Sequence, residues 1–431
     1  MRAELDHRLL YRLPWSMTDN TIAWLEPTEK CNLSCYGCYR KNVNHHKSLK
    51  EISEDLDVFA KYRKFDSVSI AGGDPLTHPE VVDIVAMVAE RGWKPTLNTN
   101  GLVLDEPLLR ELKAAGLKAV TFHIDSRQGR PGWNNKTELE TCELRLHYAE
   151  MVAKVGGILT SFNSTVYEST LDSVGDLVAW AHEPVDIVHT MVFIAYREAI
   201  LGDQFDYYID GDKVNPDKLV YTQDALRERI DIDAYDVVGK IRERYPDFAP
   251  CAYLNGSEKP DSFKWLLTTR FGNKQRIHGY MGPKAMELVQ VGGHALDGRY
   301  SAYTTPEVSR SGRAILAGLA PFDESMRRAA KSAFTDPRTL VSRIHMQTIV
   351  VIQPIDILPD GRQNMCDSCP DITPHNGELV WSCRLEERLN YGAFMKSVPK
   401  KDAEVASAAS DPGGSGATGA AASGSGREEV A

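Results

Sequence analysis

The stretch that decides the fold is Cys31-Asn32-Leu33-Ser34-Cys35-Tyr36-Gly37-Cys38. Its C-x3-C-x2-C spacing brings three thiolates within reach of one inorganic centre. A four-iron cluster with only three protein ligands keeps one iron open for a substrate or cofactor. Three spaced cysteines also suit a zinc ion, so the rest of the sequence must distinguish these two centres.

A second motif, Ser69-Ile70-Ala71-Gly72-Gly73-Asp74-Pro75, follows about one strand and one helix later. Paired glycines let the backbone approach a ligand, although the same residues also suit a plain turn. Three more apolar runs end in polar residues: Asn98-Thr99-Asn100-Gly101, Phe122-His123-Ile124-Asp125-Ser126 and Ser161-Phe162-Asn163-Ser164-Thr165-Val166. This order indicates a series of strands whose ends carry polar groups.

Together the motifs resemble the radical S-adenosylmethionine (radical SAM) superfamily. The resemblance implies a [4Fe–4S] cluster on Cys31, Cys35 and Cys38 that binds S-adenosylmethionine, with further cofactor contacts at Tyr36, Gly72, Gly73, Asp74, Asn100, Asp125 and Asn163. Two positions depart from the family pattern. Asp74 replaces the commoner Glu, and Gly37 stands where an aromatic residue usually precedes the third cysteine, so Tyr36 or Tyr39 is expected to pack against adenine instead.

Strand and helix patterns alternate through the first half of the chain, which is typical of a parallel β/α structure. Helices are predicted near 50–63, 79–92, 105–116, 138–156 and 168–183, and strands near 67–71, 94–98, 118–124, 158–163 and 185–194. The family fold implied is α/β: a partial (β/α)6 barrel with a helical or irregular insertion and a small C-terminal auxiliary metal-binding domain. Parallel barrels place their chemistry at the carboxyl ends of the strands, where the motif residues would converge.

The predicted organisation is an N-terminal lead-in at 1–20, the barrel at 21–200, a cap or substrate-specificity region at 201–345, an auxiliary domain at 346–399 and a disordered tail at 400–431. The tail is rich in Ala, Gly and Ser and lacks the apolar residues that a fold needs. A helix with alternating charge is expected near 223–244. No family motif anchors the cap, where His294 or Tyr280 is a candidate for substrate contact.

A second cysteine group, Cys366-x2-Cys369-x13-Cys383, follows the apolar run at 347–352, and Asn376-Gly377 predicts a hairpin between its last two members. The spacing resembles the twitch-type auxiliary cluster domain of GTP 3′,8-cyclase, which implies a second [4Fe–4S] cluster. Asp371 and Thr373 replace arginines of that enzyme, and its C-terminal Gly-Gly does not end this chain, so GTP cyclisation is not expected. The alternative is a zinc site completed by His375.

The two remaining cysteines stand alone in the sequence. Cys142 lies in a helical pattern and Cys251 follows Pro250, so both are read as packing residues.

Composition argues for a soluble enzyme. The chain has 431 residues and a net charge of −10, from 60 acidic and 50 basic residues. No long Lys/Arg run is present, which argues against nucleic acid as a partner. We expect no transmembrane segment, and the charged N-terminus lacks the apolar core of a signal peptide, which predicts a cytoplasmic protein.

The resemblance implies reductive cleavage of S-adenosylmethionine to a 5′-deoxyadenosyl radical, with an electron donor such as flavodoxin or ferredoxin. The radical would abstract hydrogen from, or add to, a small-molecule or lipid substrate. One alternative is a radical SAM maturase that modifies a peptide or protein. A further alternative is a non-catalytic iron–sulfur scaffold, which would have no need of Gly72-Gly73-Asp74.

Overall fold

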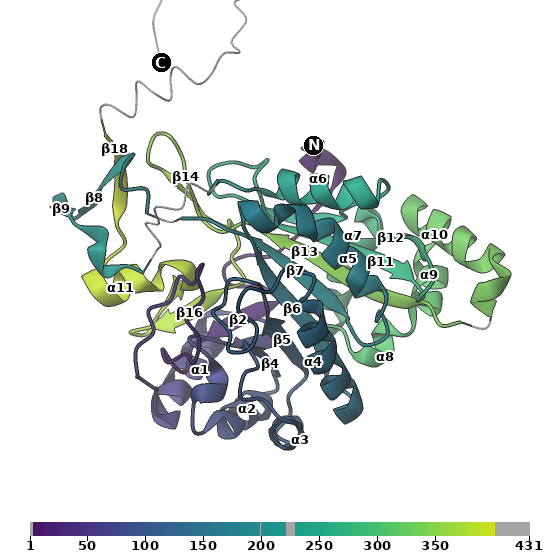
Figure 1. Cartoon of the computed structure of the whole chain (residues 1–431), viewed down its shortest axis with the longest axis horizontal. Helices are drawn as coiled ribbons and strands as arrows, with labels where there is room; N and C mark the ends of the chain where they lie inside the picture. The colour runs from purple at the N-terminus through teal and green to yellow at the C-terminus, as the bar shows by residue number, and fades with distance from the viewer. Residues whose placement is uncertain (1–2, 199, 221–228, 341, 401–431) are drawn as a thin grey trace, which may run out of the picture.

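The computed structural model describes residues 3–198, 200–220, 229–340 and 342–400. At its centre six neighbouring strands run parallel (Figure 1): β2 (Ile22–Leu25), β3 (Ser67–Ile70), β4 (Lys94–Thr99), β5 (Ala119–His123), β6 (Leu159–Val166) and β7 (Thr190–Ala195). The partial β/α barrel predicted from the sequence is therefore confirmed. The last strand begins at Thr190 rather than near 185, because the chain first makes a turn in which Ile187 N donates to Pro184 O (2.9 Å).

The sheet continues beyond β7 on the side away from β2. β13 (His345–Ile352) joins β7 in parallel, and antiparallel β11 (Phe263–Gly272) and β10 (Ala252–Asn255) follow, with β1 (Tyr11–Arg12) at the edge and β12 (Ile277–Tyr280) beside β11. Region 201–345, predicted to be helical or irregular, thus supplies three strands to the sheet. The apolar run at 347–352 lies within β13, so the boundary proposed at 346 falls inside the central sheet. Continuous apolar runs suit strands covered on both faces.

Six helices pack against the barrel strands: α1 (Leu49–Tyr62), α2 (Val81–Glu90), α3 (Glu106–Ala114), α4 (Cys142–Val155), α5 (Val174–His182) and α6 (Ala234–Arg244). Each buries an apolar side in one core, as amphipathic helices on a sheet do. The helix predicted over 168–183 is a 3-10 turn at Glu168–Ser173 followed by α5. The charged helix predicted near 223–244 begins at Ala234, and 221–228 lie outside the described residues.

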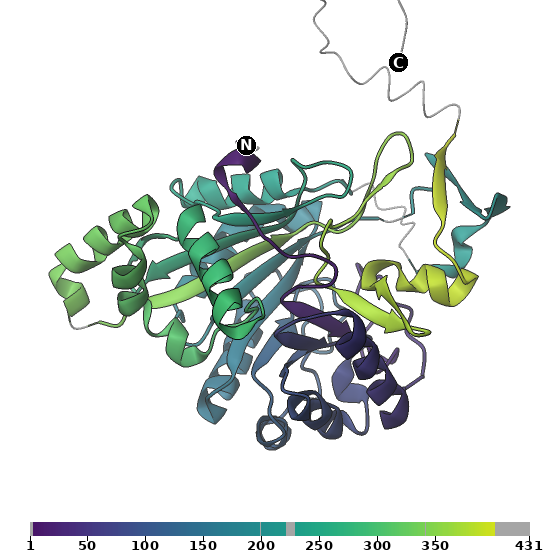
Figure 2. The ribbon, with the colours of Figure 1, turned by 180° about the vertical axis from the view of Figure 1, so that it is seen from behind.

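A second group of helices packs on the added strands around its own apolar cluster: α7 (Pro283–Asp297), α8 (Pro306–Ser309), α9 (Gly312–Leu319) and α10 (Glu324–Thr335). Figure 2 shows this group at one end of the molecule and the C-terminal segment at the other. The connection between α7 and α8 passes beneath the barrel strands, where Ala302 N donates to Asp66 Oδ2 (3.2 Å). This connection reaches the barrel interior.

The C-terminal segment folds as small sheets beside β2. A hairpin joins β16 (Ile372–His375) to β17 (Glu378–Trp381) through Asn376 and Gly377, both with positive φ, as the Asn-Gly pair predicted. The other elements are β14 (Asp356–Ile357) with β15 (Gln363–Asn364), β18 (Lys396–Pro399) with β8 (Phe205–Ile209) and β9 (Asp212–Val214), and α11 (Leu385–Tyr391). Beyond Lys400 the predicted tail lies outside the described residues.

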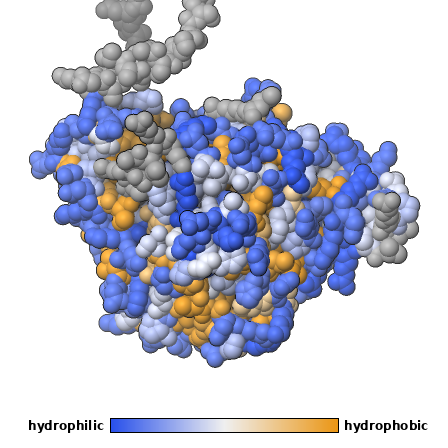
Figure 3. Space-filling model, in the orientation of Figure 1, coloured by the Kyte–Doolittle hydropathy of each residue, from blue (hydrophilic) through white to orange (hydrophobic). Residues whose placement is uncertain are grey.

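The face seen in Figure 3 carries mainly hydrophilic residues, with apolar residues gathered in smaller groups. Across the described parts of the chain, every helix is too short or too polar to cross a membrane.

Candidate active site

The first cysteine loop follows β2 and forms one wall of a cavity of about 280 Å³ at the carboxyl ends of the barrel strands. Cys31, Cys35 and Cys38 all line this cavity, which we name the cysteine cavity. The loop is held at its start, because the Asn42 side chain accepts from Cys31 N and donates to Cys31 O, each at 2.9 Å. These two hydrogen bonds therefore hold the Cys31 backbone in place at the start of the loop.

Desolvation raises the pKa of all three thiols in this loop. The carboxylate of Asp125 and the neighbouring Cys38 raise the pKa of Cys35 further. Thiolates bind metals far more strongly than thiols do, so these three groups would lose their protons on binding a metal centre at this wall. The donor set thus fits an iron–sulfur cluster.

The two glycines after β3 pack against the segment that leads into Cys31. Gly73 N donates to Thr28 O and Asp74 N donates to Lys30 O, both at 2.8 Å. A Cβ at Gly73 would lie 2.2 Å from Lys30 O, and a Cβ at Gly72, whose φ is +99°, would lie 2.3 Å from Thr28 O. The glycines line the cysteine cavity as expected, but in this structure the backbone that they approach is that of the cysteine loop itself.

Asp74 is buried, and its carboxylate ties the end of β3 to the end of β4. It accepts from Thr99 Oγ1 (2.8 and 2.9 Å), Asn100 N (2.7 Å) and Leu76 N (3.0 Å). Burial raises the pKa of Asp74, and these hydrogen bonds oppose the rise. Asn100 in turn donates to Asn32 Oδ1 at 2.6 Å, so this chain of contacts ends in the cysteine loop.

Asp125 and Asn163 line the cysteine cavity at the ends of β5 and β6. Asp125 Oδ2 lies 3.0 Å from His123 Nε2, and Arg127 N donates to Asp125 Oδ1 at 2.9 Å. Although burial acts to raise it, these contacts hold the pKa of Asp125 below its ordinary value. The carboxylate therefore stays ionised within the cavity wall.

An aromatic cluster stands beside the third cysteine. Gly37 N donates to Tyr167 Oη at 3.1 Å, and a Cβ at Gly37 would lie 2.6 Å from that oxygen. Tyr167 and Tyr196 line the cysteine cavity, whereas Tyr36 does not and packs against both rings, with centroids 5.5 and 5.8 Å away. The departure at Gly37 thus makes room for Tyr167, which the sequence analysis did not single out.

The second cysteine group lines the same cavity as the first. Cys366, Cys369 and Cys383 approach it from the C-terminal segment, and Tyr39 and Asp371 also line it. The contact with Cys366, together with burial, raises the pKa of Cys369, and desolvation raises that of Cys383 to about 12. Both sets of thiols thus face one shared space, although they are more than 300 residues apart in sequence.

A buried arginine holds the second group against the barrel. Arg63 donates to Cys369 O (2.8 Å), to Pro370 O (3.2 Å) and to Ile22 O at the start of β2 (3.1 Å). The structure does not bring His375 to the three cysteines: it does not line the cysteine cavity, and its Nε2 lies 3.1 Å from Asn376 Nδ2.

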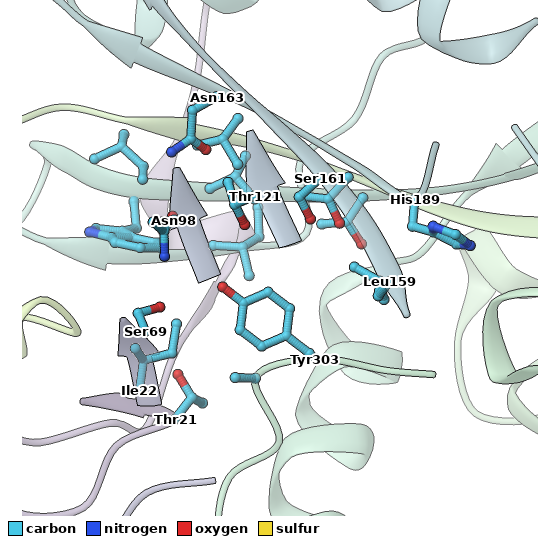
Figure 4. A pocket seen from close by; sticks show the side chains of 18 of the residues that line it. Thr21, Ile22, Ser69, Asn98, Thr121, Leu159, Ser161, Asn163, His189 and Tyr303 are labelled. Carbon is cyan, nitrogen blue, oxygen red and sulfur yellow. The ribbon is translucent and has the colours of Figure 1, made fainter. Parts of the chain in front are cut away.

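A second cavity of about 170 Å³, which we name the barrel chamber, adjoins the cysteine cavity inside the barrel, and Figure 4 shows its lining. Eight residues line both: Trp24, Asn98, Thr121, Asn163, Ile194, Trp265, Ile352 and Asp371. Neither His294 nor Tyr280 lines either space. His294 instead contacts Asp19 (2.9 Å), and Tyr280 is buried in the main core.

His189 lines the barrel chamber and supports a pH prediction. Burial and nearby Arg310 lower its pKa to about 4, and Thr160 N donates to its Nδ1 (3.1 Å). Between about pH 6.5 and 4 the unfolded chain binds a proton at this histidine and the folded chain does not, so stability falls as pH falls. From pH 7 to 5 we expect the unfolding free energy to drop about 2 kcal/mol more in wild type than in His189→Asn, measured by urea denaturation. Parallel profiles for the two proteins would contradict this.

The site and fold together define a partial β/α barrel protein with a three-cysteine loop at its carboxyl-end cavity. Residues 25–178 match the family model described as "Radical SAM superfamily". Residues 25–178 therefore carry a radical SAM domain.

Relatives with several different names match between 24% and 41% of the chain. It is 32% identical to the tungsten-containing aldehyde ferredoxin oxidoreductase cofactor-modifying protein of Pyrococcus furiosus, over 24% of this chain and 30% of that protein. It is 34% identical to the probable GTP 3′,8-cyclase of Methanocaldococcus jannaschii, over 41% of this chain and 59% of that protein. It is 25% identical to the PqqA peptide cyclase of Gluconobacter oxydans, over 41% of this chain and 52% of that protein. The matches thus span about a third to three fifths of these relatives.

Sequence reasoning missed part of the cavity wall. Tyr167 and Tyr196 directly follow β6 and β7, so their position after a barrel strand is a signal that could have found them. Tyr303 lies between two helices far along the chain, and no motif marks it. Cys142 and Cys251 are buried away from both cavities, as their sequence context predicted.

Proposed function

We propose that this chain is a two-cluster radical SAM enzyme that acts on a small molecule. Cys31, Cys35 and Cys38 would hold the cluster that binds S-adenosylmethionine, and a second [4Fe–4S] cluster would be held by Cys366, Cys369 and Cys383. The observation that carries the proposal is that both cysteine groups line one cavity. A substrate bound between them can reach both.

The position of His375 argues against the zinc alternative. A closed zinc site needs four ligands, and His375 was the fourth ligand expected beside Cys366, Cys369 and Cys383. His375 does not line the cavity that these three cysteines line. Three thiolates without a fourth protein ligand suit a four-iron cluster with one open iron.

The chemistry supplied by the first cluster, when bound, is reductive cleavage of S-adenosylmethionine to a 5′-deoxyadenosyl radical that abstracts hydrogen from, or adds to, the substrate. The chain's own residues would bind S-adenosylmethionine and orient it in the cavity. Gly72, Gly73 and Asn100 bring backbone and amide groups to the cavity wall, and Asp125 offers a buried carboxylate to a hydroxyl or an amine. The rings of Tyr167 and Tyr196 offer flat apolar surface for adenine.

The test is anaerobic reconstitution followed by iron and zinc counting, with 5′-deoxyadenosine formation measured under dithionite. We expect about eight irons in wild type and about four in a variant with Cys31, Cys35 and Cys38 changed to Ala. Only the wild type of this pair should form 5′-deoxyadenosine. A variant with Cys366, Cys369 and Cys383 changed to Ala should also hold about four irons, yet still form it.

The control is Cys251→Ala, which changes a buried cysteine away from both cavities and should keep about eight irons. About four irons and one zinc in wild type would reduce the second group to a structural site. No 5′-deoxyadenosine at all would favour the non-catalytic scaffold.

A peptide substrate is the second candidate, because one relative is named PqqA peptide cyclase. The small volume of the barrel chamber, about 170 Å³, favours a small molecule, since a peptide needs a long groove for its flanking residues.

A further inference from the structure

Part of the lining of the barrel chamber comes from a segment outside the barrel strands. Tyr303 rises into the chamber from the connection between α7 and α8, and Figure 4 shows its ring at the centre with the hydroxyl directed toward Thr121. Burial raises the pKa of Tyr303, with interactions from Ser69 and Thr121 opposing the rise. The connection is anchored below, where Arg299 donates to Gly92 O (3.1 Å). Tyr303 therefore sets how deep the chamber is.

The chamber wall carries hydrogen-bonding groups that have no partner among the described residues. Thr21 Oγ1, Asn98 Nδ2 and Ser161 Oγ are buried, and none has a hydrogen-bond partner among the described residues. Figure 4 shows these three side chains around the same space as the Tyr303 hydroxyl. Leaving such groups unpaired costs about 1–3 kcal/mol each. Three such groups around one chamber indicate that a bound molecule with polar groups pairs with them.

Another part of the wall is apolar and comes from the strands that extend the sheet. Trp265 and Leu267 of β11 and Val350 and Ile352 of β13 line it. No lysine or arginine is among the lining residues, so the chamber has no cation to pair with a phosphate or a carboxylate. Such an anion would lose its hydration without compensation.

We propose that the barrel chamber binds an uncharged ring of the substrate that bears hydroxyl or amide groups, with Tyr303 as the residue that limits its length. The ring's hydroxyl or amide groups pair with Thr21, Asn98 and Ser161, and its faces contact the β11 and β13 side chains. This assignment rests on the proposed function, because the chamber shares eight lining residues with the cavity that the cysteines line.

A matched pair of probes tests the assignment: 4-hydroxybenzamide, which is neutral, and 4-hydroxybenzoate, which has the same size and a negative charge. Dissociation constants are measured by saturation-transfer NMR on the reconstituted protein with S-adenosylmethionine present. We expect the amide to bind at least about tenfold more tightly than the carboxylate. Ser161→Ala should weaken amide binding about tenfold, and Tyr303→Trp, which fills the chamber, should weaken it more.

The control is Tyr62→Trp, the same exchange at a half-exposed position on α1, which should leave both constants unchanged. Equal binding of the two probes, binding of neither, or an unchanged constant in Tyr303→Trp would overturn the assignment. Formation of 5′-deoxyadenosine by wild type is measured in parallel. If it forms while the amide fails to bind, only the chamber assignment fails; if it does not form, the proposed function fails.

Discussion

Replacing Gly73 by alanine is expected to remove the first cluster and 5′-deoxyadenosine formation together. The new Cβ would lie 2.2 Å from Lys30 O and 2.5 Å from Lys30 C, which are backbone atoms that cannot rotate away. The turn after β3 must then separate from the segment that leads into Cys31. We expect a loss of about 3 kcal/mol in unfolding free energy, at the upper end for overpacking. Urea denaturation and iron counting measure the two effects.

The second cysteine group provides an internal reference for this variant, because its segment is held by Arg63 rather than by the glycine turn. Gly73→Ala should therefore keep about four of about eight irons. The matched control is Gly292→Ala within α7, where nothing lies within 4 Å of the added Cβ. That change should leave both irons and activity intact and raise stability by up to about 1 kcal/mol. Full iron content and wild-type cleavage in Gly73→Ala would refute the role given to the turn.

The barrel half of the fold could be predicted because its local patterns agree with its tertiary packing. Alternating helices and strands up to β6 follow from apolar periodicity, and the motif residues at strand ends meet because parallel strands share one carboxyl edge. Gly72 and Gly73 indicate from the sequence that the backbone comes close to another group there. The sequence does not tell that this group is the backbone of the segment leading into Cys31.

The other half could not be predicted from local pattern. β11 pairs with β13 some 80 residues away, and nothing in either apolar run tells which sheet receives it. Tyr303 enters the barrel chamber from a connection between helices, so its role depends on where that connection passes. The spacing of Cys366, Cys369 and Cys383 predicted a metal site, but only the folded chain shows that these cysteines line the same cavity as the first three.

Arg40 joins the two cysteine segments, and its loss is expected to be among the most destabilising changes in the chain. It lies between Glu26, which follows β2, and Glu386 of α11, with ion-pair contacts of 2.9 and 3.0 Å. All three side chains are at most 4% exposed. Although burial lowers it, the two carboxylates hold the pKa of Arg40 above its ordinary value. The guanidinium is therefore charged and is shared between the two segments.

Arg40→Met leaves two buried carboxylates without their cation, for which we expect a loss of about 3–5 kcal/mol in unfolding free energy by urea denaturation. Adding Glu26→Gln and Glu386→Gln removes both unpaired charges, and the triple variant should recover most of the loss. The control is Arg328→Met, which breaks a pair with Glu324 whose side chains are 70% and 74% exposed and should cost at most about 0.5 kcal/mol. If Arg40→Met costs no more than Arg328→Met, the ion pairs do not hold the second cysteine segment against the first.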